Sequence, residues 1–295
     1  MSGKAQIRLD GKVALITGAG RGLGAGLAKT LAERGAAVVI NYASSAKPAL
    51  ATVAEIEKEG GKAVAIQANI SKTPEVTKLF EEAIKAFGKL DIVINNAGME
   101  AFSKPEDVTE ELYDQVFGLN TRAQFFVGQH ALKYLSDGGR IIFMSSIAAR
   151  IGVPNHALYA GSKSAVEGFA RSFAADGGPR RITANAIAPG GIKTDMFAQN
   201  AWHYSPGATK DTPIETIEAG IAKLIPLGRC AVPDDIAKVV MFLCHPDSEW
   251  INGEFIGDGR SGSCLTTDLS RSNHHPHWWQ RYCLNGPLRY TGCCP

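Results

Sequence analysis

Short apolar runs alternate with longer amphipathic stretches along most of the chain. The apolar runs occupy residues 13–17, 37–41, 63–67, 91–95, 140–144, 182–187 and 254–257. Apolar residues at helical spacing occur between them, near residues 22–34, 47–59, 74–87, 107–117, 121–136, 157–175, 213–224 and 233–244. Strands that are apolar along their length and alternate with helices are typical of a parallel sheet that is buried on both faces. The pattern therefore predicts a single doubly wound (Rossmann-like) α/β domain with a seven-stranded parallel sheet, whose ligands bind at the carboxyl ends of the strands.

The alternation ends near residue 262. Residues 263–295 mix aromatic residues, histidines and cysteines without strand or helix periodicity. We therefore expect one domain over residues 1–262 and an atypical C-terminal tail over residues 263–295. Four of the six cysteines lie in this tail, close to His274, His275 and His277. Their spacing matches no closed zinc site, so we predict no metal.

Composition and charge exclude some classes of partner. The chain is 45 % hydrophobic and 20 % charged, which is ordinary for a globular enzyme. Residues 265–295 hold three arginines and one aspartate, and this difference accounts for the net charge of +2. The neutral remainder lacks the basic surface that nucleic acid or an anionic membrane requires. No signal-peptide run opens the sequence and no segment reaches membrane-spanning length, so we expect a cytoplasmic protein.

A glycine-rich loop follows the first predicted strand. Gly18, Gly20, Gly22 and Gly24 lead directly into an amphipathic stretch. Glycine permits a tight turn and a close approach to a pyrophosphate, which the N-terminus of the following helix then holds. Leu23 occupies the third-glycine place of GxGxxG, so the loop reads Thr-Gly-x-x-x-Gly-x-Gly. The strand–loop–helix context favours a dinucleotide-binding loop over an ordinary glycine-rich turn.

The end of the second predicted strand indicates which dinucleotide binds. An acid there would bind the ribose 2′-hydroxyl of NAD and repel the 2′-phosphate of NADP. The chain instead has Asn41, followed by Tyr42 and Ser44, with Arg21 in the glycine loop. Hydroxyl and guanidinium groups bind phosphate well, so we expect NADPH/NADP+ as the cofactor. The alternative is that Arg21 is an ordinary solvated loop residue.

Tyr159 and Lys163 stand four residues apart in a predicted helix, which places them on one face about one turn apart. Only small residues separate them, which leaves room for another group to approach. Taken alone, the pair is better explained by a half-buried tyrosine beside a lysine whose chain lies along apolar surface. The rest of the sequence must therefore decide between these interpretations.

Several motifs together decide it. TGxxxGxG at 17–24, NNAG at 95–98, Ser146, YxxxK at 159–163 and PGGIKTDM at 189–196 occur in this order. In these motifs the chain resembles the short-chain dehydrogenase/reductase family, from about residue 10 to residue 262. The resemblance implies reduction of a carbonyl group by a hydride from the nicotinamide.

The resemblance also implies the catalytic roles. Tyr159 is the proton donor, and Lys163 lowers the pKa of its phenol and binds the nicotinamide ribose. Ser146 orients the substrate carbonyl, and Ser145 is a second choice because the strand pleat turns it away. Asn120 matches a family asparagine that holds a water in a proton relay, with a structural helix cap as the alternative.

Further cofactor contacts are implied by position. They are Leu23 after the glycine turn, Asn69 where many relatives have an aspartate against the adenine, Asn96 of the NNAG motif, and Ile192 and Thr194 after the last glycines.

Residues 195–231 correspond to the substrate lid of the family. Met196, Phe197, Trp202 and Tyr204 would give this lid an aromatic lining, suited to a flat polycyclic phenol. In the combination of NNAGMEAF, LNTRAQFFV, PNHALYAGSK, APGGIKTDMF and HYSPG the chain resembles the fungal polyhydroxynaphthalene, hydroxyanthraquinone (anthrol) and versicolorin-type reductases. In this subgroup a tyrosine at the place of Tyr204 stacks on the substrate.

The resemblance implies an NADPH-dependent ketoreductase of aromatic polyketide biosynthesis that assembles as a homo-oligomer, either a tetramer or a dimer. Met196, Tyr204, Ser146 and Tyr159 are the expected substrate contacts. Three alternatives stay open: a 3-oxoacyl-thioester reductase, a steroid carbonyl reductase, and a catalytically silent NADPH-binding protein.

Overall fold

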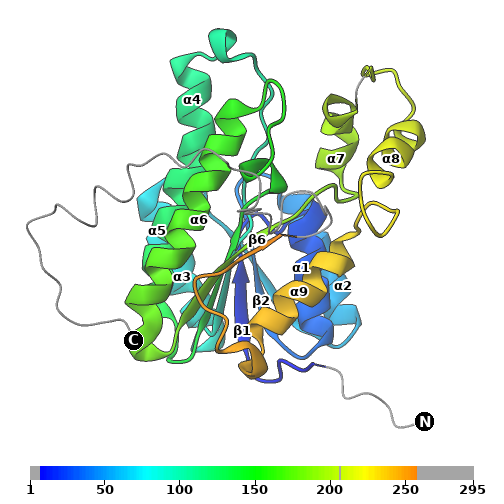
Figure 1. Cartoon of the computed structure of the whole chain (residues 1–295). Coiled ribbons are helices and arrows are strands. Elements are labelled where there is room, and N and C mark those ends of the chain that lie inside the picture. The colour runs from blue at the N-terminus through cyan, green and yellow to red at the C-terminus, as the bar shows by residue number, and fades with distance from the viewer. Residues whose placement is uncertain (1–6, 206, 258–295) are drawn as a thin grey trace, which may run out of the picture. The chain divides into compact units, whose positions relative to one another are not determined.

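The computed structural model describes residues 7–205 and 207–257, and the predicted tail over residues 263–295 lies outside them. Seven parallel strands form one sheet in the order β3-β2-β1-β4-β5-β6-β7 (Figure 1). The strands are β1 (Val13–Ile16), β2 (Ala37–Tyr42), β3 (Lys62–Gln67), β4 (Ile92–Asn95), β5 (Arg140–Met144), β6 (Thr183–Ala188) and β7 (Phe255–Gly257). The predicted fold class is confirmed, because each apolar run forms a strand of this sheet.

Helices cover both faces of the sheet. They are α1 (Gly22–Glu33), α2 (Ala46–Lys58), α3 (Thr73–Phe87), α4 (Glu110–Phe117), α5 (Gln124–Tyr134), α6 (Ala157–Gly177), α7 (Asp195–Asn200), α8 (Ile214–Ala222) and α9 (Pro233–Cys244). None of the described helices is long and apolar enough to cross a membrane.

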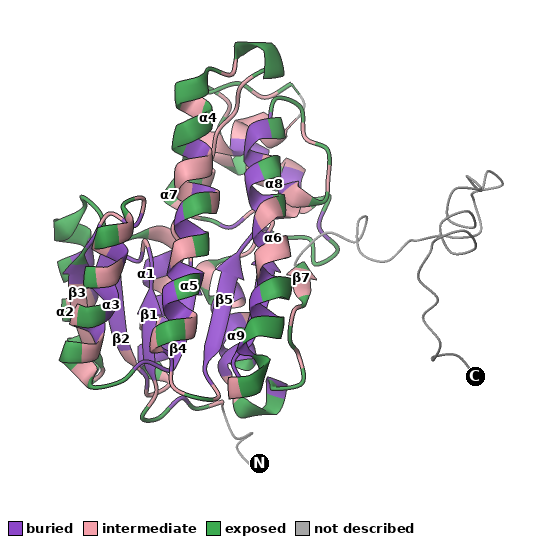
Figure 2. Ribbon diagram, turned by 90° about the vertical axis from the view of Figure 1, so that its left-hand side faces the viewer, coloured by how far each residue is buried: buried purple, intermediate pink, exposed green. Residues whose placement is uncertain are grey.

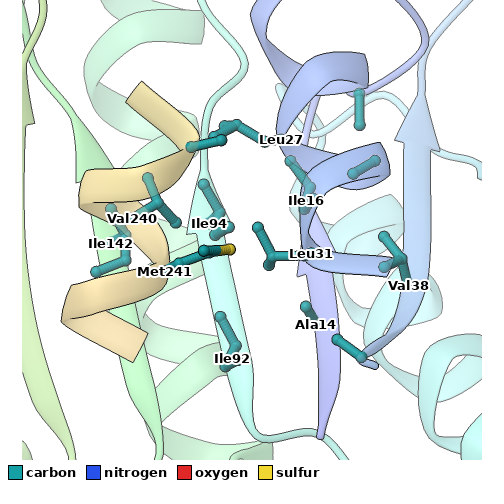
Figure 3. Packing of buried hydrophobic residues seen from close by; sticks show 14 of the residues in the cluster. Ala14, Ile16, Leu27, Leu31, Val38, Ile92, Ile94, Ile142, Val240 and Met241 are labelled. Carbon is teal, nitrogen blue, oxygen red and sulfur yellow. The ribbon is translucent and has the colours of Figure 1, made fainter. Parts of the chain in front are cut away.

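Alternate residues of each central strand face opposite layers, as the period of two in a strand requires. On one face, Ile16 and Ile94 pack in a core cluster with Leu27 and Leu31 of α1 and with residues of α9 (Figure 3). On the other face, the intervening strand residues pack against α3, α5 and α6. Strands β1, β4 and β5 are therefore buried along their whole length (Figure 2).

Two helical predictions differ from the structure. The stretch 121–136, expected as one α-helix, begins in a π-helical segment, Gly118–Ala123, and becomes regular at Gln124. This segment contains Asn120, whose side chain is fully buried. A π-helical turn often marks a functional position, and here it turns an amide inward among other polar groups.

The second difference is α7, which the sequence did not predict. Thr194 begins this helix, and its hydroxyl accepts a hydrogen bond from the backbone N–H of Phe197. α7, a 3-10 turn over Ala201–Tyr204 and α8 form the region expected as the lid, and their apolar residues make a small cluster of their own. In both views α4, α7 and α8 lie beyond the carboxyl ends of the strands (Figures 1 and 2). The site therefore lies at that edge of the sheet.

Candidate active site

The loop between β1 and α1 has the shape of a phosphate-binding turn. Gly18 and Gly22 have φ angles of +61° and +58°, a left-handed conformation that favours glycine. A Cβ atom on Gly24 would lie 2.6 Å from the carbonyl oxygen of Gly18, so the close approach of helix and loop requires glycine there. No side chain caps the N-terminus of α1 at Arg21, and its first turn holds no acid. The exposed helix N–H groups and the absence of negative charge fit a dinucleotide pyrophosphate.

Asn96 fixes this loop from the neighbouring strand. Its Nδ2 donates to the carbonyl oxygens of Thr17 at 2.9 Å and Gly18 at 3.2 Å. Its backbone N–H donates to the Thr17 hydroxyl at 3.0 Å. The side chain of Asn96 is thus occupied by the protein backbone, and we assign it the positioning of the glycine loop.

Asn41, which we expect to contact the cofactor, lies at the end of β2. The residue is 1 % exposed, and its Oδ1 accepts a hydrogen bond from the backbone N–H of Gly18. Its Nδ2 lies within hydrogen-bond distance of backbone carbonyls, at 3.0 Å from Ala68 and 3.4 Å from Ile66. The side chain points inward because a neutral amide at the end of β2 can link the loop to β3. The side-chain bonds of Asn41 are thus made to the protein backbone, and its contact with the cofactor stays a prediction.

The remaining predicted cofactor residues surround the loop. Tyr42 is half-buried and Ser44 is exposed at the end of β2. The Arg21 side chain is 65 % exposed, and its Nη1 lies 4.0 Å from a carboxylate oxygen of Asp195. Asn69 is half-buried, and its Oδ1 accepts a hydrogen bond from the backbone N–H of Ser71.

Three more predicted cofactor residues are Ile192, Thr194 and Leu23. Ile192 is buried and forms a β-bridge with Ala231. Thr194 comes close to the loop, because a Cβ atom on Gly22 would lie 3.9 Å from its Cβ. Leu23 packs against the core from the first turn of α1.

The structure brings Ser146, Tyr159 and Lys163 together. Ser146 follows β5, and its hydroxyl is close enough to the Tyr159 phenol to lower the pKa of that group. Lys163 lies one turn along α6, with its Nζ 5.8 Å from the centroid of the Tyr159 ring. The neighbouring Ser145 points the other way and donates to the backbone carbonyl of Lys163 at 3.1 Å. The strand pleat thus separates the two serines as expected.

Burial dominates the acidity of these groups. It raises the pKa of Tyr159 above its usual value, the negative charge of Glu100 raises it further, and the hydrogen bond from Ser146 opposes both effects. Burial also lowers the pKa of Lys163 to about 8, against the opposing effect of Glu100. We expected the pKa of Tyr159 to be lowered. The protein groups raise it instead, because burial disfavours the phenolate.

Asn120 links the catalytic helix to the loop after β4. Its Oδ1 accepts from the backbone N–H of Met99, and its Nδ2 donates to the Met99 carbonyl, both at 2.8 Å. Nδ2 also donates to the hydroxyl of Ser162 at 3.1 Å. Asn120 is not a helix cap, since it lies inside the π-helical segment. Its part in a proton relay stays a prediction.

Gly98 lets the polar groups approach this loop closely. A Cβ atom there would lie 3.1 Å from Nζ of Lys163 and 3.2 Å from Oδ1 of Asn120. Any larger residue at this position would therefore push against both catalytic candidates.

A cluster of rings and one acid joins the lid to the catalytic helix, and the sequence interpretation missed most of it. The Tyr204 hydroxyl forms hydrogen bonds with a carboxylate oxygen of Glu100 and with Nε2 of His156, the latter at 3.1 Å. Phe102 stacks between His156 and His203, at centroid distances of 4.1 and 3.8 Å. The signal that could have revealed Glu100 is an acid two residues after the NNAG motif, where the chain has left β4 at the ligand-binding edge.

Trp202 and Met196, two further residues of the predicted lid lining, differ in their surroundings. Trp202 stacks on His203 with centroids 3.5 Å apart, which continues the row of rings outward. Met196 is 43 % exposed on α7. Among the described residues, no group of three histidines, cysteines or acids could hold a metal ion, while His274, His275 and His277 lie outside them.

Comparisons with known proteins show the family of this chain. The family described as Enoyl-(Acyl carrier protein) reductase matches residues 18–257. The hydroxynaphthalene reductase-like protein Arp2 of Metarhizium brunneum (strain ARSEF 3297) is 63 % identical over 249 residues, which are 84 % of this chain and 93 % of that protein. The tetrahydroxynaphthalene reductase PfmaG of Pestalotiopsis fici (strain W106-1 / CGMCC3.15140) is 58 % identical over 247 residues, covering 83 % of this chain and 89 % of the relative.

A solved structure extends the likeness to the fold. The crystal structure of the landomycin C-6 ketoreductase LanV with bound NADP and rabelomycin is similar with a TM-score of 0.73 and 38 % identity, covering 85 % of this chain and 95 % of that one. The fold and the site thus define an oxidoreductase that uses a nicotinamide dinucleotide. The chain belongs to the short-chain dehydrogenase/reductase family, as its motifs indicated.

Proposed function

We propose that this protein uses NADPH to reduce the keto tautomer of a polycyclic phenol, a hydroxyanthraquinone hydroquinone or a polyhydroxynaphthalene. One observation carries the proposal. The buried Tyr159 ring lies beside the His156 ring, from which a row of rings runs through Phe102 to His203 and Trp202 of the lid. Flat aromatic substrates stack on such rings, whereas a flexible acyl chain gains less from them. The hydroxynaphthalene and tetrahydroxynaphthalene reductase names of the relatives support this substrate class.

The residues of this chain divide the reaction among them. Ser146 donates a hydrogen bond to the substrate carbonyl oxygen and stabilises the charge that develops there. Tyr159 donates its phenolic proton to that oxygen, and burial keeps the phenol protonated until the reaction. Lys163 carries a positive charge below its pKa of about 8 and stabilises the phenolate that remains. The bound cofactor, held by the glycine loop and by Lys163, supplies the hydride.

Selection of NADPH rests on charge at the end of β2. The exposed groups near this point are the Arg21 guanidinium and the hydroxyl of Ser44, with Tyr42 half-buried beside them. A 2′-phosphate would find donors here, and the buried neutral Asn41 offers no carboxylate to repel it. The NADP bound in the landomycin ketoreductase supports the same choice.

Biological context follows from the substrate class. We infer a step of aromatic polyketide secondary metabolism in which the enzyme removes the aromaticity of one ring by reducing its keto form. A cytoplasmic location and assembly into a homo-oligomer, a tetramer or a dimer, are part of this proposal.

A substrate panel tests the proposal. The full chain is incubated with NADPH or NADH and with dithionite-reduced hydroxyanthraquinones, hydroxynaphthalenes, an acetoacetyl thioester and a 17-ketosteroid, and products are separated by chiral chromatography. We expect turnover of the phenols with NADPH, and its loss in a Tyr159→Phe variant that still binds NADPH. Turnover of the thioester or the steroid alone would contradict the substrate class. Cofactor binding without any turnover would contradict the proposed activity and favour a silent binding protein.

A further inference from the structure

Glu100 is an acid buried at the ligand-binding edge of the sheet. It lies in the loop after β4, and the preceding residue, Met99, exchanges two hydrogen bonds with the Asn120 side chain. Its side chain is only 9 % exposed. The Tyr204 hydroxyl is hydrogen-bonded to its Oε1, so Glu100 is the point at which the catalytic end of the sheet meets the lid.

The neighbours of this carboxylate are mostly neutral. Nε2 of His156 lies 3.8 Å from Oε1, but burial lowers the pKa of His156 to about 4, so the imidazole carries no charge near neutral pH. The Tyr204 hydroxyl donates a hydrogen bond to the carboxylate, and the nearby Asn200 amide also favours its charged form. Lys163 acts on it through charge, while its Nζ donates to the Met144 carbonyl. Burial accordingly raises the pKa of Glu100.

A purely structural role explains this arrangement poorly. A buried carboxylate costs free energy unless a cation or several donors satisfy it. A glutamine of the same shape could accept the bond from Tyr204 without that cost. A carboxylate has room for about four hydrogen bonds, which leaves acceptor capacity for a group that arrives with the substrate.

Glu100 also lies close enough to Tyr159 for its charge to raise the pKa of that phenol. The His156 ring lies 4.6 Å from the Tyr159 ring and meets the Tyr204 ring edge-on at 5.6 Å. His156 thus connects the proton donor with the tyrosine that contacts Glu100. A planar ketone whose oxygen reaches Tyr159 and Ser146 must extend its rings toward this group.

We propose that Glu100 is a specificity residue that accepts a hydrogen bond from a phenolic hydroxyl of the substrate, while Tyr204 lies against the substrate ring. The proposal rests on the proposed function and narrows it to substrates that carry a hydroxyl in reach of Glu100. A phenol O–H bound to a carboxylate forms a short, charge-assisted hydrogen bond. An analogue without this hydroxyl leaves the buried carboxylate without that donor and is rejected. A phenolate is repelled, so the neutral phenol is selected.

The test compares two ketones that differ by hydroxyl groups alone. Steady-state rates with NADPH are measured for 2-tetralone and for a set of its monohydroxylated derivatives, in the wild-type full chain and in a Glu100→Gln variant. We expect the wild type to prefer at least one hydroxylated ketone. In the variant the ratio of kcat/KM between that ketone and 2-tetralone should fall about 10- to 100-fold, mainly through KM.

Two controls keep the result interpretable. NADPH binding, followed by cofactor fluorescence, shows that the Glu100→Gln protein is folded. A Tyr204→Phe variant removes the hydroxyl partner of Glu100 but retains the ring, and it should keep the preference for the hydroxylated ketone.

The possible results separate this proposal from the function on which it rests. An equal fall for both ketones in Glu100→Gln would overturn it, since Glu100 would then act through Tyr159 or Lys163. A wild type that reduces 2-tetralone but favours no hydroxylated derivative would overturn it as well, although carbonyl reduction would stand. A wild type that reduces neither these ketones nor the phenols of the panel would refute the proposed function, and this proposal with it.

Discussion

The ammonium group of Lys163 donates a hydrogen bond to the backbone carbonyl of Met144 at 2.8 Å. Met144 is the last residue of β5, and Lys163 lies in the second turn of α6, so this bond ties the catalytic helix to the end of the sheet. The same β5 end carries Ser145 and Ser146. One contact therefore helps to set both the position of the Lys163 charge and the position of Ser146, the serine that we propose contacts the substrate.

The pH dependence of activity should report the state of Lys163. Burial lowers its pKa to about 8, so the ammonium is present below that pH and is lost above it. We expect kcat/KM for ketone reduction to fall as pH rises through about 8. A Lys163→Arg variant keeps its charge, so the activity that it retains should persist to higher pH. The exposed Lys133→Arg is the matched control and should leave the profile in place. An unchanged falling limb in Lys163→Arg would assign it to another group.

The free energy of unfolding gives a second measure of the pKa of Lys163. The folded pKa of about 8 lies below the usual 10.5, so between these values the unfolded chain binds more protons than the folded one. The free energy of unfolding of the wild type should therefore rise with pH over this window relative to Lys163→Met, by up to about 3 kcal/mol. Urea unfolding of both proteins at matched pH values measures the difference. Parallel curves would show that burial does not shift this lysine.

Asn41 should govern stability more than cofactor choice. An Asn41→Asp variant places a carboxylate where the amide now binds the backbone of β3, and it can no longer donate to the Ala68 and Ile66 carbonyls. We expect the free energy of unfolding to fall by about 2–4 kcal/mol in urea titrations, with NADPH still preferred over NADH. Ser44→Asp, on the exposed end of β2, is the companion variant and should weaken NADPH binding with little loss of stability. A stable Asn41→Asp protein that prefers NADH would contradict the inward placement of this side chain.

Alanine substitutions at Gly24 and Gly20, two glycines of the loop after β1, should have very different effects on stability and cofactor binding. In Gly24→Ala the new Cβ would lie 2.6 Å from the Gly18 carbonyl oxygen and 2.7 Å from Nδ2 of Asn96, and backbone atoms cannot move aside easily. We expect a loss of about 1–3 kcal/mol in stability and severe loss of NADPH binding. In Gly20→Ala the nearest atom is 3.5 Å away, an ordinary contact, so cofactor fluorescence should show binding close to wild type. Equal behaviour of the two variants would show that the loop adjusts to the added methyl group.

The elements that place the site were largely predictable because each depends on local information. A strand buried on both faces must be apolar throughout, so β1, β4 and β5 were visible as runs of apolar letters. The spacing of Tyr159 and Lys163 places them on one helix face whatever surrounds them. The short helix α7 was missed because its start depends on the Thr194 cap rather than on an apolar stripe.

By itself, the sequence determined the order of apolar and amphipathic segments along the chain, the glycine loop, and the residue types that carry the chemistry. Only the tertiary structure decided which way Asn41 points, how burial shifts the pKa values of Tyr159 and Lys163, and that Glu100 meets Tyr204 across 104 residues of chain. The physical reason is how far apart along the chain the interacting residues lie. Periodicity and turns arise from neighbours along the chain, whereas desolvation and hydrogen bonding between distant loops exist only once the layers have packed.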